Sequence, residues 1–188
     1  MALNHKSKFL FYNIIIFCSG AIANLAIPPF YIFPSVFALG FGIYLITLSP
    51  SFMKSFVSGW FLGFGWFTFG LYWIGSAFMV ADTFHKVLMP FAIVILPSIL
   101  AIFWGFACVF AKLLTKKKHS SIFLTIVFLT LFEYLRAKLF TGFPWLMPSM
   151  TLSSNEYLIQ IFSFIGSFTA NLFVFTFSIL PFILISKI

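Results

Sequence analysis

The chain has 188 residues, of which 62% are hydrophobic and 7% are charged, and its formal net charge is +8. Soluble domains carry about a quarter charged residues, so this composition excludes a soluble globular fold. A nucleic-acid-binding role is also excluded, because the basic residues lie between apolar segments instead of along one face. The sequence predicts an all-α, polytopic membrane helical bundle.

Six apolar segments are long enough to cross a bilayer, which takes roughly 20 residues. We predict about six transmembrane helices in a single transmembrane domain, 1–188, with no soluble catalytic domain. The predicted spans are 9–27, 31–48, 56–81, 87–114, 121–140 and 157–185. Pro28 and Pro29 cannot continue a helix and predict a tight hairpin after the first span. Pro97 predicts a kink inside the fourth span.

The distribution of Lys and Arg between the loops predicts the orientation, because cytoplasmic loops carry the excess. With a cytoplasmic N-terminus, eight basic residues face the cytoplasm: Lys6, Lys8, Lys54, Lys112, Lys116, Lys117, Lys118 and Lys187. Three face outward: Lys86, Arg136 and Lys138. We therefore predict that the N-terminus is cytoplasmic and that the loop after the fifth span faces outward.

Glycine and aromatic residues mark the third span. Gly59 and Gly63 are about one helical turn apart, which lets another helix approach the backbone closely. Tyr72 and Trp73 follow near the predicted outer interface, where amphipathic rings can border a cleft open to lipid. Ordinary helix packing explains the same pattern, so both interpretations stay open.

Two charged residues, Glu133 and Arg136, lie near the outer end of the fifth span. Ionisable residues inside a span are costly and usually face a cavity or one another. Because these two are three residues apart, their side chains can pair on one face of a helix. One interpretation is a structural ion pair that tethers the helix end. The other is a polar platform for a phospholipid headgroup, since a guanidinium binds phosphate through two hydrogen bonds.

The segment after that span combines helix breakers with aromatic residues. Gly142 and Pro144 interrupt the helix, while Thr141, Phe143 and Trp145 surround them. Non-helical backbone at membrane depth survives only where it is buried in protein or lines a cavity. The segment is therefore either a wall of a binding site or a plain interfacial loop.

Other polar residues indicate no separate catalytic site. Asn171 lies in the last span, where its amide is expected to form a hydrogen bond across helices. Cys18 and Cys108 lie in apolar segments and are expected to be packing residues. Asp82 and His85 belong to a loop that we expect to be solvated. The sequence predicts no metal site and no cofactor.

These motifs together resemble the membrane portion of the apolipoprotein N-acyltransferase family. The family signature is an E-x-L-R block followed by T-G-F-P-W, which here reads Glu133-Tyr-Leu-Arg136 and then Thr141-Gly-Phe-Pro-Trp145. Three further segments are similar in collinear order: residues 20–30, the glycine-rich stretch that contains Gly65 and Gly70, and residues 166–172. Our candidates for lipid or substrate binding are Glu133, Arg136, Thr141, Gly142, Phe143, Pro144, Trp145, Tyr72 and Trp73. Our candidates for helix packing are Gly59, Gly63, Gly65, Gly70 and Asn171.

The resemblance implies a role in bacterial lipoprotein maturation at the inner membrane. Enzymes of this family move an acyl group from a phospholipid to the α-amino group of a lipoprotein's N-terminal cysteine. They do so with a Glu-Lys-Cys set on a nitrilase-like domain, which these 188 residues do not include. We therefore expect a truncated membrane domain, inactive alone, whose partners are phospholipid and, once completed by a separate nitrilase-like chain, the lipoprotein N-terminus.

Two alternatives from other functional classes stay open. A small secondary transporter would use Glu133, Arg136 and Asn171 as a polar path through the membrane. A non-catalytic lipid-binding scaffold would bind phospholipid without forming an acyl-enzyme. Substrate-dependent flux in liposomes, lost on Glu133→Gln, would favour the transporter.

Overall fold

The computed structural model describes residues 5–80, 83–115, 118–140, 142 and 144–186, so that Thr141 and Phe143 lie outside the described residues. Within these ranges every regular element is a helix, which confirms the all-α prediction. The elements, with η for a 3₁₀ helix, are α1 (His5–Ala23), η1 (Asn24–Ala26), η2 (Phe33–Ser35), α2 (Val36–Thr47), α3 (Phe52–Gly70), α4 (Ile74–Val80), α5 (Thr83–Leu114), α6 (Lys118–Leu139), η3 (Pro148–Ser154), α7 (Glu156–Ile159) and α8 (Ile161–Ile185).

The helices follow most of the predicted apolar segments. The structure differs in three places: the range 56–81 is divided between α3 and α4, the range 157–185 is divided between α7 and α8, and His85, expected in a loop, lies in the first turn of α5. Asp82 lies outside the described residues. Three stretches of the described residues are long and apolar enough to cross a membrane, namely Ser7–Ala26, Lys86–Leu114 and Ile161–Ile185. The number of six spans and their orientation stay predictions.

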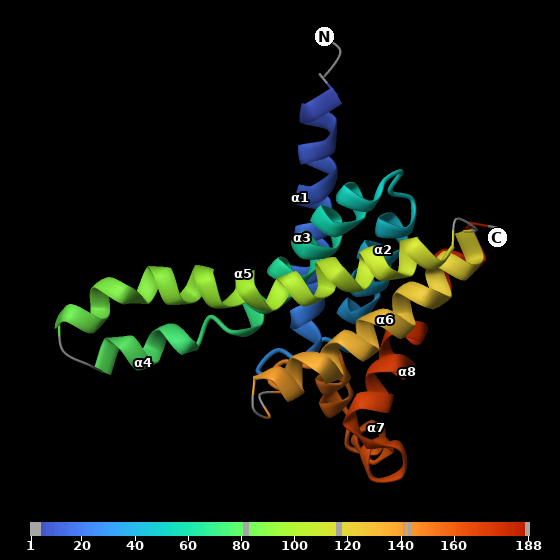
Figure 1. Cartoon of the computed structure of the whole chain (residues 1–188). Helices are drawn as coiled ribbons and strands as arrows, with labels where there is room; N and C mark the ends of the chain where they lie inside the picture. The colour runs from blue at the N-terminus through green and yellow to red at the C-terminus, as the bar shows by residue number, and fades with distance from the viewer. Residues whose placement is uncertain (1–4, 81–82, 116–117, 141, 143, 187–188) are drawn as a thin grey trace.

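Helix α3 is the centre of the bundle and packs between α1 and α5 (Figure 1). Helix α2 packs on α1 and α8, and α6 packs on α5 and α8. Small residues permit the closest contacts: a Cβ atom added at Gly65 would lie 2.1 Å from the carbonyl oxygen of Phe17. One at Gly40 would lie 1.9 Å from the carbonyl oxygen of Ser178. The bundle is therefore held by backbone-to-backbone packing as well as by a core that includes Trp66 and Trp104.

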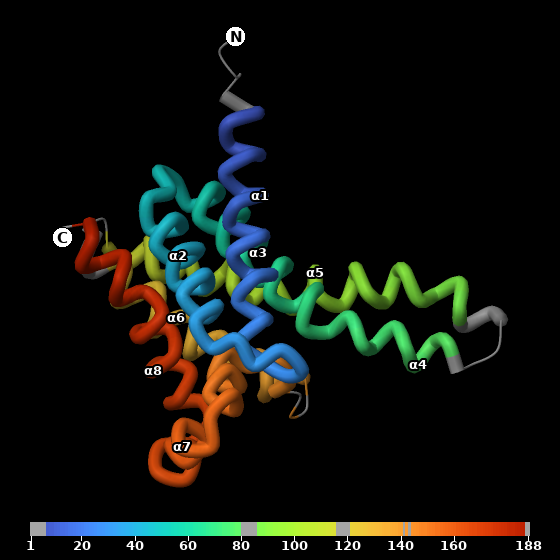
Figure 2. The backbone as a smooth tube through the Cα atoms, turned by 180° about the vertical axis from the view of Figure 1, so that it is seen from behind, coloured from blue at the N-terminus to red at the C-terminus, as the bar shows by residue number. Residues whose placement is uncertain are grey.

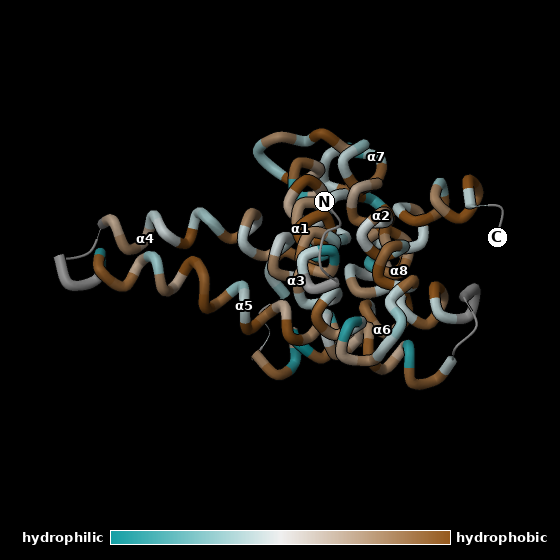
Figure 3. The backbone as a smooth tube through the Cα atoms, turned by 90° about the horizontal axis from the view of Figure 1, so that it is seen from above, coloured by the Kyte–Doolittle hydropathy of each residue, from teal (hydrophilic) through white to brown (hydrophobic). Residues whose placement is uncertain are grey.

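Helix α4 and the first part of α5 form a hairpin, here called the arm, that projects away from the other helices (Figures 1 and 2). Apolar residues continue along α5 through the arm (Figure 3), and Met79, Val87 and Phe91 are exposed on it. Because long exposed apolar surfaces are unfavourable in water, we expect the arm to lie against lipid or another protein surface.

The outer end of the bundle, named after the predicted orientation, comprises η1, η2, residues 71–73, Gly142, residues 144–147 and η3. Helix η3 contacts η1, η2 and α8. The chain between η1 and η2 turns through a cis peptide bond between Pro28 and Pro29. This end therefore gathers irregular backbone from three distant parts of the sequence.

Candidate functional site

Glu133 and Arg136 form a fully buried ion pair on α6. Nη2 of Arg136 lies 2.6 Å from Oε2 of Glu133, and both side chains are 0% exposed. Nε of Arg136 also donates to Oε1 of Glu133, at 3.3 Å. The indole of Trp104 on α5 donates to the same Oε1 at 2.8 Å. Burying both charges is tolerable because each partner neutralises the other and further hydrogen bonds satisfy them.

The same arginine joins α6 to the outer end. Its Nη2 donates to the carbonyl oxygen of Trp145 at 3.1 Å, and its guanidinium lies 5.1 Å from the centre of the Phe67 ring. A group that is fully buried among protein partners presents no surface to a phosphate in this arrangement. The geometry thus favours the tethering ion pair over the exposed headgroup platform.

Several backbone contacts fix the segment after α6. Gly142 adopts a left-handed φ of 85°, and its N–H donates to the carbonyl oxygen of Ala137 at 2.7 Å, closing the helix. The indole of Trp66 on α3 donates to the carbonyl oxygen of Leu146 at 2.8 Å. Pro144 lies between these anchors and is half-buried. The segment is therefore fixed on both sides of Trp145.

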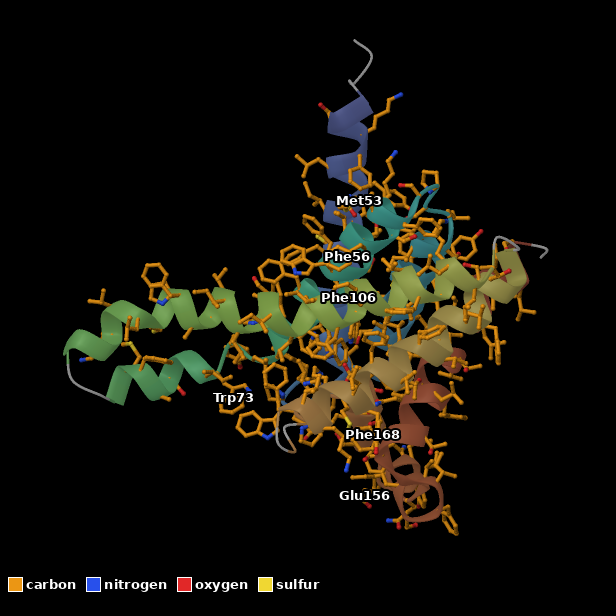
Figure 4. The ribbon with its side chains drawn as sticks, viewed as in Figure 1. Met53, Phe56, Trp73, Phe106, Glu156 and Phe168 are labelled. Atoms are coloured by element: carbon orange, nitrogen blue, oxygen red, sulfur yellow. The ribbon has the colours of Figure 1, made fainter. Side chains whose placement is uncertain are left out.

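The indole rings of Trp73 and Trp145 meet at this fixed segment. Their centroids are 5.2 Å apart, and both side chains remain partly exposed, as does the neighbouring Tyr72. Trp73 lies at the base of the arm (Figure 4), where α3 has ended and α4 has not yet begun. Two candidates separated by 72 positions in the sequence are thus brought into contact.

Two apolar cavities flank this aromatic pair. The first, here called the outer cavity, has a volume of about 830 Å³ and is lined by residues that include Pro29, Tyr72, Trp73 and Leu146. The second, here called the arm cavity, has a volume of about 460 Å³ and is lined by Trp73, Trp145, residues of α4 and α5, and Phe140, which directly follows α6. Trp73 therefore borders both. Volumes of this size and apolar linings are typical of small-molecule and lipid sites.

Asn24 in the wall of the outer cavity was missed by the sequence analysis. Its Nδ2 donates to the carbonyl oxygens of Gly20 at 3.2 Å and Trp66 at 2.6 Å. Its Oδ1 is buried and has no hydrogen-bond partner among the described residues. An asparagine amide in a largely apolar span, which Asn24 shares with Asn13, was the signal that could have identified it, because such amides usually bond across helices.

The helix-packing candidates lie at close contacts. A Cβ atom on Gly59 would be 2.6 Å from Sγ of Cys108, and one on Gly63 would be 3.1 Å from Cα of Ala101, so both glycines face α5. Gly70 faces the outer end, where an added Cβ would be 2.1 Å from Cδ2 of Leu146.

Asn171 joins α8 to η3. Its Oδ1 accepts a hydrogen bond from the backbone N–H of Ser149 at 2.8 Å. Within the part of the chain that the structure describes, no group of three or more His, Cys, Asp or Glu residues could hold a metal ion.

Comparisons with known proteins agree with the motifs. Residues 19–180 match the family profile described as the apolipoprotein N-acyltransferase N-terminal domain. Proteins named apolipoprotein N-acyltransferase are similar to the chain at 39% identity in Rhodopseudomonas palustris, over 81% of this chain and 30% of that protein. In Rhizobium rhizogenes the identity is 35%, over 84% of this chain and 32% of that protein. In Rickettsia bellii it is 31%, over 82% of this chain and 31% of that protein. The chain therefore spans about a third of the length of these relatives.

Proposed function

The chain belongs to the apolipoprotein N-acyltransferase family, and from this premise we propose that its outer end binds the acyl chains of phospholipid for the N-acylation of bacterial lipoproteins. In this proposal the protein is a multi-pass component of the bacterial inner membrane. It supplies the binding surface for the lipid and the seat for a catalytic domain.

The observation that carries the proposal is the position of Trp73. It borders the outer cavity and the arm cavity, and its ring contacts Trp145. Aromatic rings at a membrane interface bind well both to apolar chains and to the polar region above them. Acyl chains in the two cavities would thus lie on either side of a common aromatic wall.

The buried ion pair has a positioning role in this proposal. Arg136 holds the carbonyl of Trp145 and is itself held by Glu133, so the wall is anchored to α6. The pair does not touch lipid directly. Its loss would displace the wall and weaken lipid binding indirectly.

Acyl transfer needs chemistry that the outer end does not provide. A thiolate nucleophile requires an adjacent base and an oxyanion site. Cys108 is buried against Gly59 between α3 and α5, away from the outer cavity. We propose that the 188-residue chain transfers no acyl group unless a nitrilase-like domain accompanies it. That domain would come from the same polypeptide or from a separate chain, and would bring the lipoprotein N-terminus to the bound lipid.

Lipid retention tests the binding part of the proposal. The purified chain would be exchanged into detergent with a labelled phosphatidylethanolamine, and the bound fraction compared between wild type, Trp73→Ala and Trp145→Ala. Removing one aromatic contact should lower retention by about fivefold. Phe164→Ala is the matched control, because Phe164 is exposed on α8 and lines neither cavity. Equal retention in all four proteins would contradict the proposal.

An acylation assay tests the catalytic part. The chain alone, incubated with phospholipid and a diacylated lipopeptide, should give no triacylated product. Product from the purified 188-residue chain alone would show that it contains a nucleophile that we have not assigned.

A further inference from the structure

Three lysines converge at the end of the bundle opposite the outer end, which we call the lysine end. Lys8 comes from α1, Lys54 from α3 and Lys112 from α5, and they surround the loop of residues 49–51 between α2 and α3. Met53, in the first turn of α3, marks this end in Figure 4. In the predicted orientation it faces the cytoplasm.

Two cavities lie on either side of this loop. One has a volume of about 330 Å³ and is lined by Lys8, Lys54, Ser49 and their neighbours. The other has a volume of about 440 Å³ and is lined by residues 50–52 and Lys112. Both include Pro50, so a single loop separates two hollows that each have lysine in the wall.

The positive charge of these cavities is not balanced by nearby acids. The sequence has three acidic residues. Glu133 is paired with Arg136, Glu156 begins α7 at the far end of the bundle, and Asp82 lies outside the described residues. Among the described residues no carboxylate lines either cavity. A group of lysines without carboxylates attracts an anion.

The loop itself adds donors that suit a phosphate. The hydroxyl of Ser49 is buried, with 4% of the residue exposed, and its Oγ has no partner among the described residues. Nζ of Lys112 donates to the carbonyl oxygen of Ser49, which holds the ammonium group at the loop. Helix α3 starts here, with Ser51 as its N-cap, and its first N–H groups carry the positive end of the helix dipole. Helix N-termini commonly bind phosphate groups.

Apolar side chains beside the lysines indicate where such a phosphate would come from. Leu10, Phe11 and Met53 are exposed next to Lys8 and Lys54, and Met53 is 71% exposed. Lys54 also lies over the ring of Phe9, with Nζ 5.5 Å from its centre. Charged donors above an exposed apolar surface match a phospholipid, whose phosphate lies above its acyl chains.

We propose that the lysine end binds the phosphate of an anionic phospholipid headgroup, held by Lys8, Lys54 and the hydroxyl of Ser49, while Lys112 positions the loop through the carbonyl of Ser49 and adds its positive charge. This site is separate from the outer end and does not depend on acyl transfer. It would anchor the bundle to the inner leaflet, with the lipid acting as a structural ligand.

Native mass spectrometry of the full chain tests this proposal. Protein in detergent is mixed with equal phosphatidylglycerol and phosphatidylcholine, and the bound lipids are counted. Phosphatidylglycerol should be retained preferentially, and each of Lys54→Gln and Lys112→Gln should weaken its retention by about fivefold. Lys54→Arg should keep most of it. Lys86→Gln is the matched control, because it removes an equal charge from an exposed position on the arm.

Two further measurements distinguish a specific phospholipid site from diffuse charge attraction and from a site for a free anion. Ser49→Ala leaves the charge of the protein unchanged and should still reduce the retention of phosphatidylglycerol. If Ser49→Ala has no effect, the lysines attract the lipid diffusely and the proposed site is refuted. Inorganic phosphate should not displace phosphatidylglycerol if the headgroup is the ligand. Displacement by inorganic phosphate would keep the phosphate site and assign it to a free anion. Equal retention in wild type, Lys54→Gln, Lys112→Gln and Lys86→Gln would refute the proposal.

Discussion

The two ends of the bundle differ in where their charged side chains lie and in whether an opposite charge neutralises them. At the outer end, Arg136 is fully buried and neutralised by Glu133, and the surface is left to Trp73 and Trp145. At the lysine end, the cations stay near the surface, and no carboxylate of the described residues lines their cavities. A charge that is neutralised inside the protein stabilises the fold, whereas a charge without a carboxylate beside it can bind an anionic ligand. In our two proposals, acyl chains therefore bind at the outer end and phosphate binds at the lysine end.

The largest expected effect comes from breaking the neutralised charge at the outer end. Arg136→Ala leaves Glu133 buried without its partner, which should lower the free energy of unfolding by about 3–5 kcal/mol. Thermal unfolding of the purified protein in detergent measures it. Lys138→Ala, an exposed position on the same helix, is the control and should change stability little. If Arg136→Ala and Lys138→Ala unfold at the same temperature, the ion pair is not a tether.

A smaller effect is expected where α8 holds η3. Asn171→Ala removes the acceptor of the buried Ser149 N–H, and an unsatisfied buried donor costs about 1–3 kcal/mol. Because η3 contacts η1 and η2, the outer cavity should also lose part of its shape. Chemical unfolding checks the first effect and lipid retention the second. Ser163→Ala, on an exposed hydroxyl of α8, should leave both unchanged; a matching loss there would contradict the assignment.

Substitutions of two glycines, Gly70 at the outer cavity and Gly75 in the arm, test which of these two regions shapes the lipid site. Gly70→Ala places a methyl group 2.1 Å from Cδ2 of Leu146 and 2.5 Å from Oδ1 of Asn24, and overpacking of this kind costs about 1–3 kcal/mol. Gly75→Ala comes closest to the tip of Ile93, at 2.7 Å, which can rotate away. Lipid retention and unfolding free energy should therefore fall for Gly70→Ala and stay near wild type for Gly75→Ala. The reverse order would show that the arm, and not the outer cavity, shapes the site.

The smallest effect on stability is expected at the lysine end. Lys54→Gln removes a charge that has no carboxylate partner among the described residues, so stability should change by no more than about 0.5 kcal/mol. Retention of phosphatidylglycerol should nevertheless fall in the same protein. Unfolding without added lipid, followed by native mass spectrometry, gives both values. A large loss of stability in Lys54→Gln would show that Lys54 stabilises the fold, and the charges at the two ends would then not differ in their role.

The positions of the long helices could be predicted from apolar length alone. The division of the range 56–81 could not, because apolar residues continue from α3 through Trp73 into α4. The end of α3 lies at Gly70, which faces Leu146 from a distant part of the chain. Hydropathy measures preference for lipid and carries no information on such contacts.

In the candidate site, too, a contact between residues close in the sequence could be predicted, whereas contacts between distant segments could not. The pairing of Glu133 with Arg136 follows from their spacing of three residues. That Arg136 also holds the carbonyl of Trp145, and that Trp145 meets Trp73, depends on the packing of α6 against α5 and of α5 against α3. Motif and spacing thus named Trp73, Trp145 and Arg136 as candidates, whereas their contacts with one another depend on the tertiary structure.

Photo-cross-linking tests the central claim most directly. A phosphatidylethanolamine with a diazirine at the end of one acyl chain would be incorporated with the full chain into nanodiscs, irradiated, and the modified peptides identified by mass spectrometry. We predict labelling of residues 69–74 and 145–153, which contribute to the walls of the two cavities, and its loss in Trp73→Ala. Labelling confined to the exposed faces of α1, α5 and α8, unchanged by Trp73→Ala, would contradict the assignment of the acyl chains to the outer end.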